Sequence, residues 1–334
     1  MPIRVIIDCD TGIDDALALT LALSSDKLDI LGITTVTGNV DCENTTRNTC
    51  NVCHFLDRDD IRVAKGASKP FEREPFRASG VHGVTGLRGW SFAKDYKDNL
   101  VNEDAIEFMN KTISKSDGKV TIIAIGPLTN IALLFRKYPE IRLNIERIVF
   151  MGTSYHCGNP TSLATFNVLA DPEAFREVIF SGVEFISCPL DVTKTAVFRD
   201  EDIEKLRQID NKAAEFCVSI MSNYGIAFIG KEEKISSQNE EVITPERIAN
   251  SKAEGVTMHD PATVAYVIAP ELFSTNKYYC DVECRGELTT GFTLIDKNNY
   301  YRKSEAERNL TLIESIDREK FVSLFIEAVK RYSE

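Results

Sequence analysis

The sequence predicts an α/β fold: a doubly wound, mainly parallel sheet with flanking helices and a small extra strand region near the C-terminus. Short β-branched runs, such as residues 5–7, 119–125 and 145–151, alternate with segments of helical length. This alternation is typical of βαβ units, in which crossover helices connect parallel strands. Polar or glycine-rich segments follow several of the runs, at the sheet edge where ligands bind in open α/β folds.

Length and composition favour a single globular domain over residues 1–334. The chain is 43% hydrophobic and 27% charged, which is ordinary for a globular protein, and it shows no internal repeat or linker. Its net charge of −12 argues against a nucleic-acid surface, because nothing offsets the repulsion by phosphates.

Three features predict a cytoplasmic protein that does not enter a membrane. No apolar run approaches the roughly 20 residues that span a bilayer. The first predicted strand begins almost at Met1, which leaves no room for a signal peptide. Nine cysteines, an odd number scattered through the chain, fit a reducing compartment better than a disulfide framework.

The strands of the main sheet are predicted from apolar, β-branched runs bounded by turn residues. They span, in chain order, residues 5–7, 29–36, 61–64, 119–125, 145–151 and 183–187. Alternating residues within 278–294 predict the extra strands near the C-terminus.

Helices are predicted at residues 16–23, 42–56, 103–116, 131–137, 201–230 and 317–332. Asp171 followed by Pro172 suits another helix start, because aspartate caps free amides and proline fits the first helical turn.

Two segments show neither helical nor strand periodicity. In residues 65–100, His82 stands among glycines, which suits either a mobile lid or a surface loop with an incidental histidine. Residues 231–254 are polar and predict an insertion or a flexible excursion.

Four aspartates lie within the eight positions that follow the first strand: Asp8, Asp10, Asp14 and Asp15. In a partly desolvated site these carboxylates would repel one another strongly, so a cation is expected among them. A hard divalent cation with oxygen ligands suits them best. A helix N-terminus would explain Asp14 and Asp15 but not the other two.

Further polar groups are expected at the same sheet edge. They are Asn39, the backbone carbonyl of Ile125, the loop 159–167 and the pair His259-Asp260. This oxygen-rich set suits Ca²⁺ or Mg²⁺ and a polyhydroxy ligand, and it lacks the cysteines and histidines of a zinc site. No phosphate-binding GxxxxGK[ST] or dinucleotide-binding GxGxxG motif follows the first strand.

Seven short motifs stand in order along the chain. They are DCDTGIDD at 8–15, TGN at 37–39, VHG at 81–83, GPLTN at 126–130, GN at 158–159, FN at 166–167 and MHDP at 258–261. This ordered set resembles the inosine–uridine-preferring nucleoside hydrolases nearly from end to end. The resemblance implies a homo-dimeric or homo-tetrameric enzyme that uses Ca²⁺ to hydrolyse the N-glycosidic bond of ribonucleosides, yielding ribose and a free purine or pyrimidine base.

The resemblance also implies how the reaction centre is built. Calcium would be held by Asp10, Asp15, Asp260 and the Ile125 carbonyl. Asp10 would take a proton from the attacking water as general base. His259 is the first candidate to protonate the leaving base, and His82 is the second.

Substrate contacts follow from the same resemblance. The ribose diol would be bound by Asp14, Asn39, Asn167 and Asp260. Asn159 would reach the 5′-hydroxyl, and the base would lie near His82, Tyr224 and Phe228. The sequence departs from the family pattern at Thr11, where proline is usual, and at Thr165, where glutamate is common. The shorter Thr165 side chain predicts tolerance of 5′-modified ribose, and base preference stays open.

Two other functions fit part of the pattern. Asp8-Cys9-Asp10-Thr11 mimics the nucleophile motif of haloacid dehalogenase-type phosphatases, but that chemistry leaves Asp14-Asp15 and His259-Asp260 unexplained. A non-catalytic nucleoside- or sugar-binding protein with the same calcium cage is the second alternative.

Overall fold

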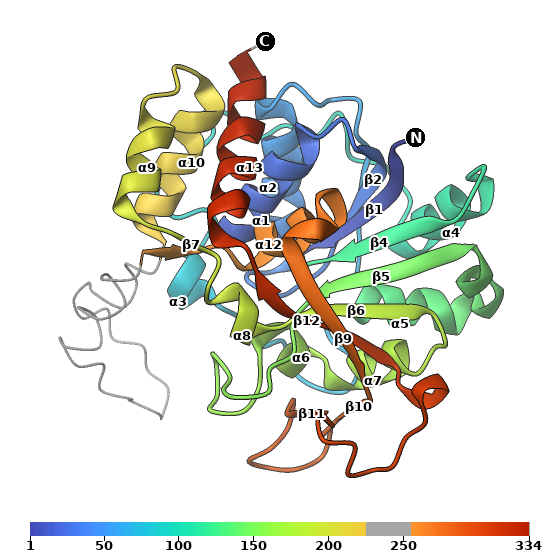
Figure 1. Cartoon of the computed structure of the whole chain (residues 1–334). Helices are drawn as coiled ribbons and strands as arrows, with labels where there is room; N and C mark the ends of the chain where they lie inside the picture. Colours follow the sequence, from blue (N-terminus) through green and yellow to red (C-terminus); the bar gives the residue numbers. More distant parts are fainter. Residues whose placement is uncertain (225–254, 334) are drawn as a thin grey trace.

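An eight-stranded sheet forms the centre of the computed structural model, which describes residues 1–224 and 255–333 (Figure 1). The strand order is β3-β2-β1-β4-β5-β6-β12-β9. All neighbours are parallel except β12 and β9, which pair antiparallel at one edge. The strands are β3 Val63–Lys65, β2 Leu28–Thr35, β1 Ile3–Cys9, β4 Val120–Ala124, β5 Ile145–Met151, β6 Glu184–Cys188, β12 Leu310–Ile316 and β9 Phe273–Tyr278.

Two small antiparallel sheets accompany the main one. β10 (Cys280–Val282) pairs with β11 (Thr293–Ile295), and β7 (Val197–Phe198) pairs with β8 (Val256–Thr257). The predicted α/β architecture and its extra strand region near the C-terminus are therefore confirmed.

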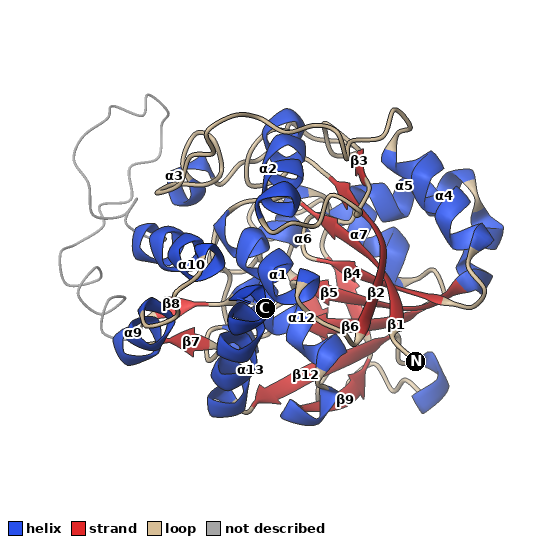
Figure 2. Cartoon of the chain, turned by 90° about the horizontal axis from the view of Figure 1, so that it is seen from above, coloured by secondary structure: helices blue, strands red, loops and turns tan. Residues whose placement is uncertain are grey.

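Helices cover both faces of the main sheet (Figure 2). One face carries α1 Ile13–Leu23, α2 Cys42–Phe55, α10 Lys212–Asn223, α12 His259–Ile268 and α13 Arg318–Lys330. The other face carries α4 Ala105–Lys115, α5 Thr129–Lys137 and α7 Pro172–Ile179. The remaining helices are α3 Ser79–His82, α6 Phe166–Ala170, α8 Leu190–Thr193 and α9 Asp200–Arg207.

Strand β1 shows why helices must cover both faces of the sheet. Val5 and Ile7 point into the core beneath α1 and α12, whereas Ile6 points into the core beneath α4 and α5. Successive side chains of a strand alternate between faces, so a strand that is apolar throughout requires cover on both sides.

The strand order places a topological switch point beside β1. The chain runs from β1 to β2 and β3 on one side and then returns to β4 on the other. In doubly wound sheets the crevice at such a point, outside the carboxyl ends of the strands, is the usual ligand site. The acidic turn after β1 and the Gly126-Pro127 turn after β4 both lie there.

The described part of the helical region predicted over 201–230 holds two helices, α9 and α10. α10 begins where the Asn211 side chain accepts a 2.7 Å hydrogen bond from the Ala214 amide. Strand β12 was not predicted, although it lies inside the main sheet. Residues 225–254 lie outside the described part, and so do the excursion predicted over 231–254 and the substrate contact predicted at Phe228. Across the described ranges, no helix is both long and apolar enough to cross a membrane.

Candidate active site

The turn after β1 is closed by the side chain of Asp15. Its Oδ1 accepts a 3.0 Å hydrogen bond from the Asp10 amide, and its Oδ2 accepts one of 2.9 Å from the Gly12 amide. Asp15 is the third residue of α1, so it caps the helix start and folds back on the turn. A capping role therefore explains its position, but not the other acids around it.

Asp10 is enclosed by the ends of neighbouring strands. Its Oδ2 accepts a 2.7 Å hydrogen bond from the Asn39 amide, in the turn after β2. A Cβ atom at Gly38 would lie 2.0 Å from Oδ2, and one at Gly126 would lie 2.9 Å from Oδ1. Only glycine lets both turns approach the carboxylate this closely.

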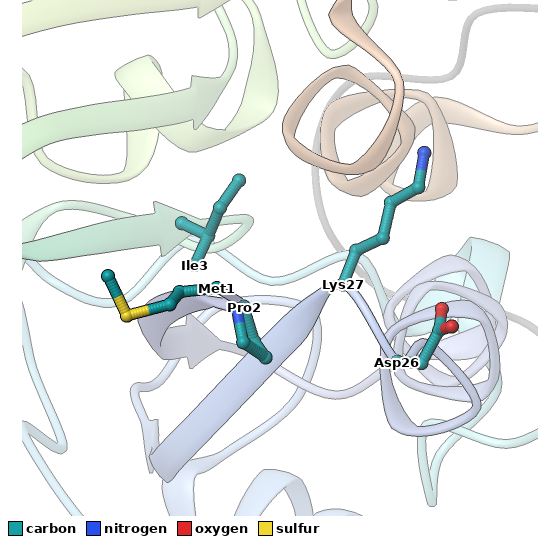
Figure 3. Close-up of a pocket in the computed structure, with 5 residues that line it drawn as sticks. All are labelled: Met1, Pro2, Ile3, Asp26 and Lys27. Carbon is teal, nitrogen blue, oxygen red and sulfur yellow. The ribbon is translucent and has the colours of Figure 1, made fainter.

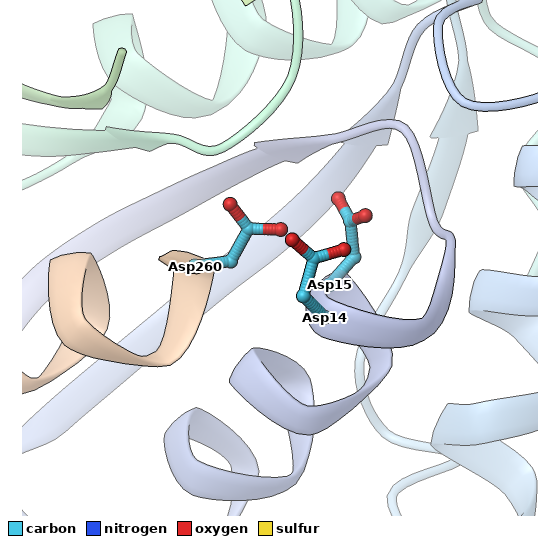
Figure 4. A group of neighbouring side chains, drawn as sticks. All are labelled: Asp14, Asp15 and Asp260. Atoms are coloured by element: carbon cyan, nitrogen blue, oxygen red, sulfur yellow. The ribbon is translucent and has the colours of Figure 1, made fainter. Parts of the chain in front are cut away.

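Asp14, Asp15 and Asp260 form the buried acidic cluster, in which one carboxylate oxygen of each lies within 4.8 Å of the others. Asp14 and Asp15 come from the first turn of α1 and Asp260 from the first turn of α12, and their carboxylates converge (Figure 4). Burial and like charges raise the pKa of Asp15 to about 7 and that of Asp260 well above its usual value.

The donor atoms of this region fit a hard divalent cation. Oδ1 of Asp10 and Oδ1 of Asp14 are buried, and neither has a hydrogen-bond partner within the described part of the chain. Burial and the charge of Asp15 raise the pKa of Asp10 well above its usual value. Buried carboxylates without donors are costly unless a cation accompanies them, and Ca²⁺ prefers such oxygen ligands.

Two asparagines join the strand ends around the acids. The Asn39 side-chain amide donates a 2.9 Å hydrogen bond to Oδ2 of Asp15. The Asn167 amide, from α6, donates to the carbonyl oxygens of Ile125 at 2.8 Å and Met151 at 3.0 Å. The Ile125 carbonyl therefore has a side-chain partner at the strand ends.

His82 is buried beside α1. Its Nδ1 accepts a 3.1 Å hydrogen bond from the Ile13 amide, which leaves Nε2 as the nitrogen that carries the proton of the neutral ring. Oδ1 of Asp14 lies 3.8 Å from the same Nδ1, too far for a hydrogen bond. Burial lowers the pKa of His82, although the charge of Asp14 opposes this shift.

Tyr224 closes the site from the end of α10. Its hydroxyl donates a 3.2 Å hydrogen bond to Oδ2 of Asp14, and its ring lies 5.8 Å from that of His82. Tyr224 therefore lies beside Asp14 and His82, the two residues that the sequence linked to ribose and base.

His259 precedes Asp260 at the start of α12. Its Nδ1 lies 2.7 Å from the hydroxyl oxygen of Thr193, the last residue of α8. Desolvation lowers the pKa of His259, and the negative charge of Asp14 opposes that shift. Both predicted proton donors, His82 and His259, thus lie close enough to Asp14 for its charge to act on their pKa.

Asp8 lies near the end of β1 and supports the acidic turn through hydrogen bonds. Its Oδ1 accepts hydrogen bonds from the Thr34 hydroxyl at 2.5 Å and from the Asn130 side-chain amide at 2.7 Å. Burial raises the pKa of Asp8 to about 7. Asn130 also donates to the carbonyl of Thr35, so one side chain joins the ends of β1 and β2 to α5.

Two residues of the loop before α6 make local contacts. Asn159 is exposed, and its Oδ1 accepts a 2.9 Å hydrogen bond from the Phe166 amide. Thr165 is buried, and its hydroxyl accepts a 3.2 Å hydrogen bond from the Thr153 amide. Their predicted relation to a 5′-hydroxyl stays a prediction.

Thr34, Asn130 and Thr193 were not predicted as site residues. Asn130 ends the GPLTN motif, which marked its position but gave it no role. Thr34 lies inside a strand and Thr193 in a four-residue helix, and neither position carries a signal in the sequence. These residues could not be predicted because each meets its partner, Asp8 or His259, only through the packing of segments that lie far apart in the chain.

A separate surface pocket lies at the other end of β1. Met1, Pro2, Ile3, Asp26 and Lys27 line it (Figure 3). It is therefore removed from the acidic turn by the length of the strand, and it contains none of the predicted site residues.

Fold and site together define the class: a doubly wound α/β protein with a buried, oxygen-rich cluster at its switch point. Comparison with known proteins identifies the family. The model of the inosine-uridine preferring nucleoside hydrolase family matches residues 5–323. The chain belongs to this family and is a nucleoside hydrolase enzyme.

Relatives match over nearly the whole chain. The pyrimidine-specific ribonucleoside hydrolase RihA of Shewanella sp. (strain MR-7) is 38% identical over 330 residues, 98% of this chain and 96% of its own. RihA of Shigella boydii serotype 4 (strain Sb227) is 37% identical over 333 residues, 100% of both chains. The solved structure of a purine-preferring ribonucleoside hydrolase from Gardnerella vaginalis has a TM-score of 0.85 at 27% identity and covers 99% of both chains.

Proposed function

We propose that this enzyme hydrolyses the N-glycosidic bond of ribonucleosides in a Ca²⁺-dependent reaction that releases ribose and free base. The observation that carries the proposal is the buried carboxylate of Asp10 next to the acidic cluster. Its Oδ1 has no hydrogen-bond donor among the described residues. Asp10, Asp15, Asp260 and the Ile125 carbonyl would hold the ion, with an oxygen of Asp14 close by. When bound, calcium supplies positive charge that acidifies a water and orients the ribose hydroxyls.

Asp10 is assigned the role of general base. The Asn39 amide occupies Oδ2, so Oδ1 is the oxygen available to take a proton from the attacking water. The water oxygen bonds to the anomeric carbon opposite the base, and the electron pair of the C–N bond leaves with the base. Surrounding carboxylates stabilise the positive charge that develops on the sugar.

The ribose is bound by the polar groups that surround Asp10. Asp14, Asn39, Asn167 and Asp260 are assigned to its 2′- and 3′-hydroxyls. The contacts of Asn39 with Asp15 and of Asn167 with the Ile125 carbonyl support this assignment, because they hold both amides at the rim of the cation site. A substrate without the 2′-hydroxyl loses part of this binding.

The leaving base receives its proton from a histidine. His259 is our first candidate and His82 the second, since both lie close enough to Asp14 for its charge to act on their pKa. Tyr224 donates a hydrogen bond to the ribose-binding Asp14, has its ring beside that of His82, and is assigned to substrate binding.

Pyrimidine ribonucleosides are the proposed substrates. Relatives at 37–38% identity over the whole chain carry the name pyrimidine-specific ribonucleoside hydrolase, whereas the purine-preferring structure is less similar at 27%. We also infer a homo-dimer or homo-tetramer from the family and a cytoplasmic location from the nine free cysteines.

A substrate panel tests this function. Uridine, cytidine, inosine, their 2′-deoxy forms and the corresponding nucleotides are incubated with the enzyme, with and without a calcium chelator, and free base, ribose and phosphate are measured. We expect base and ribose from at least uridine or cytidine, little product from the deoxy forms, and loss of both products on chelation. Release of phosphate from nucleotides without any ribose would overturn the proposal in favour of a phosphatase.

A further inference from the structure

Thr193 is the side chain bonded to the ring of His259. Its hydroxyl oxygen lies 2.7 Å from Nδ1 and is fully buried, whereas the histidine is only partly buried. Thr193 ends α8, the short helix that follows strand β6 of the main sheet. The hydroxyl therefore comes from a fixed element next to the site.

The segment around Thr193 is anchored to the start of α12 by a second contact. The amide of Met258, the residue before His259, donates a 2.8 Å hydrogen bond to the carbonyl of Ala196. The Thr193 amide is in turn bonded to the Pro189 carbonyl at 3.0 Å. Backbone and side-chain contacts together fix the distance between the hydroxyl and the imidazole.

The hydroxyl also has an acceptor of its own. Oγ1 of Thr193 lies 3.4 Å from the Leu190 carbonyl, to which it can donate its only proton. The same oxygen then accepts from Nδ1–H of His259, whose tautomer is assigned from this bonding pattern. Nε2 is left as the ring nitrogen that exchanges a proton with a bound ligand.

We propose that Thr193 is a positioning residue that holds the imidazole of His259 with Nδ1 protonated and Nε2 directed at the leaving base. This rests on the proposed function, in which His259 protonates that base. In the step, the ring starts as the imidazolium, with a proton on each nitrogen. Its Nε2–H bond breaks, the base nitrogen takes the proton, the C–N electron pair stays on the base, and the neutral ring keeps Nδ1–H. Nδ1–H remains bonded to Thr193 before and after the transfer, so the ring does not reorient.

Two variants and two substrates separate positioning from a general structural effect. Thr193→Val keeps the shape of the side chain and removes the hydroxyl, and Thr193→Ser keeps the hydroxyl. Uridine needs a proton on its leaving base. The probe 4-nitrophenyl β-D-ribofuranoside does not, because nitrophenolate leaves as a stable anion.

We expect Thr193→Val to lower kcat for uridine at least about tenfold, with KM nearly unchanged, because general acids typically contribute about 10²–10⁴-fold. The nitrophenyl riboside should be cleaved at the wild-type rate, and Thr193→Ser should recover most of the uridine kcat. Equal losses on both substrates, or no loss on uridine, would overturn the positioning role. If the wild type cleaves neither substrate with calcium present, the proposed function itself fails.

The tautomer gives a readout that does not depend on turnover. In ¹⁵N NMR spectra of the wild-type enzyme, the neutral ring of His259 should show a protonated Nδ1 and an unprotonated Nε2. The opposite tautomer would contradict the proposal, even if Thr193→Val fails to fold.

Discussion

The backbone amide of Asn39 donates a 2.7 Å hydrogen bond to Oδ2 of Asp10. This contact joins the turns after two neighbouring strands, β2 and β1, at the carboxylate assigned as general base. It occupies one oxygen of Asp10 and leaves the other without a donor among the described residues. Asp10 is therefore held in one orientation with a single free oxygen.

Asp10→Asn should nearly abolish turnover without unfolding the protein. The amide oxygen of asparagine can accept the same bond from Asn39, but its nitrogen cannot take a proton from water. We expect kcat for uridine to fall by about 10²–10⁴-fold, the typical contribution of a general base. Steady-state kinetics measure the loss, and circular dichroism checks the fold. A rate near that of wild type would refute the general-base assignment.

Gly38→Ala should disturb the same carboxylate sterically. The added Cβ would lie 2.0 Å from Oδ2 of Asp10, so either the turn or the carboxylate must move. A displacement of about 1 Å in an active site can cost about 10²-fold in rate, and we expect a loss of that order. Gly118→Ala is the matched control, because its Cβ would meet only the flexible end of Arg4. Equal activity of the two variants would contradict the close approach.

Asp8 is expected to matter for stability through the two donors that it accepts. Asp8→Asn keeps an acceptor oxygen for the Thr34 hydroxyl and the Asn130 side-chain amide. Asp8→Ala leaves both donors without this acceptor. An unmet buried hydrogen-bonding group costs about 1–3 kcal/mol, so the asparagine variant should be the more stable by about that amount. Urea unfolding of both variants measures the difference. Identical free energies of unfolding would show that Asp8 does not hold this junction.

Alternation of strands and helices was predictable because it depends on local periodicity. Strand β12 was missed since its place between β6 and β9 depends on pairing with segments that are distant in the chain. The acidic turn was also visible, since its four aspartates lie within eight positions. Spacing could not reveal that Asp14 approaches Asp260 across α1 and α12, nor that Thr193 meets His259. Such contacts depend on how separate elements pack.

Tyr224→Phe removes the hydroxyl that donates to Asp14 and should weaken substrate binding. Losing one hydrogen bond to a carboxylate is worth about 1.5 kcal/mol, so KM for uridine should rise about tenfold. Tyr332→Phe is the matched control: its hydroxyl donates a 2.8 Å hydrogen bond to the Thr20 carbonyl, away from the acidic turn. The control should lose about 1 kcal/mol of stability and keep its KM. A KM of Tyr224→Phe equal to that of wild type would remove Tyr224 from the binding site.

Calcium add-back to chelator-treated enzyme tests the central claim most directly. Bound calcium is measured by isothermal titration calorimetry, and release of ribose from uridine is measured in the same samples. The acidic cluster of Asp14, Asp15 and Asp260, with the buried Asp10 next to it, predicts one strong site per chain, with ribose release rising in proportion to its occupancy. Full uridine hydrolysis by enzyme that holds no divalent cation would contradict the account.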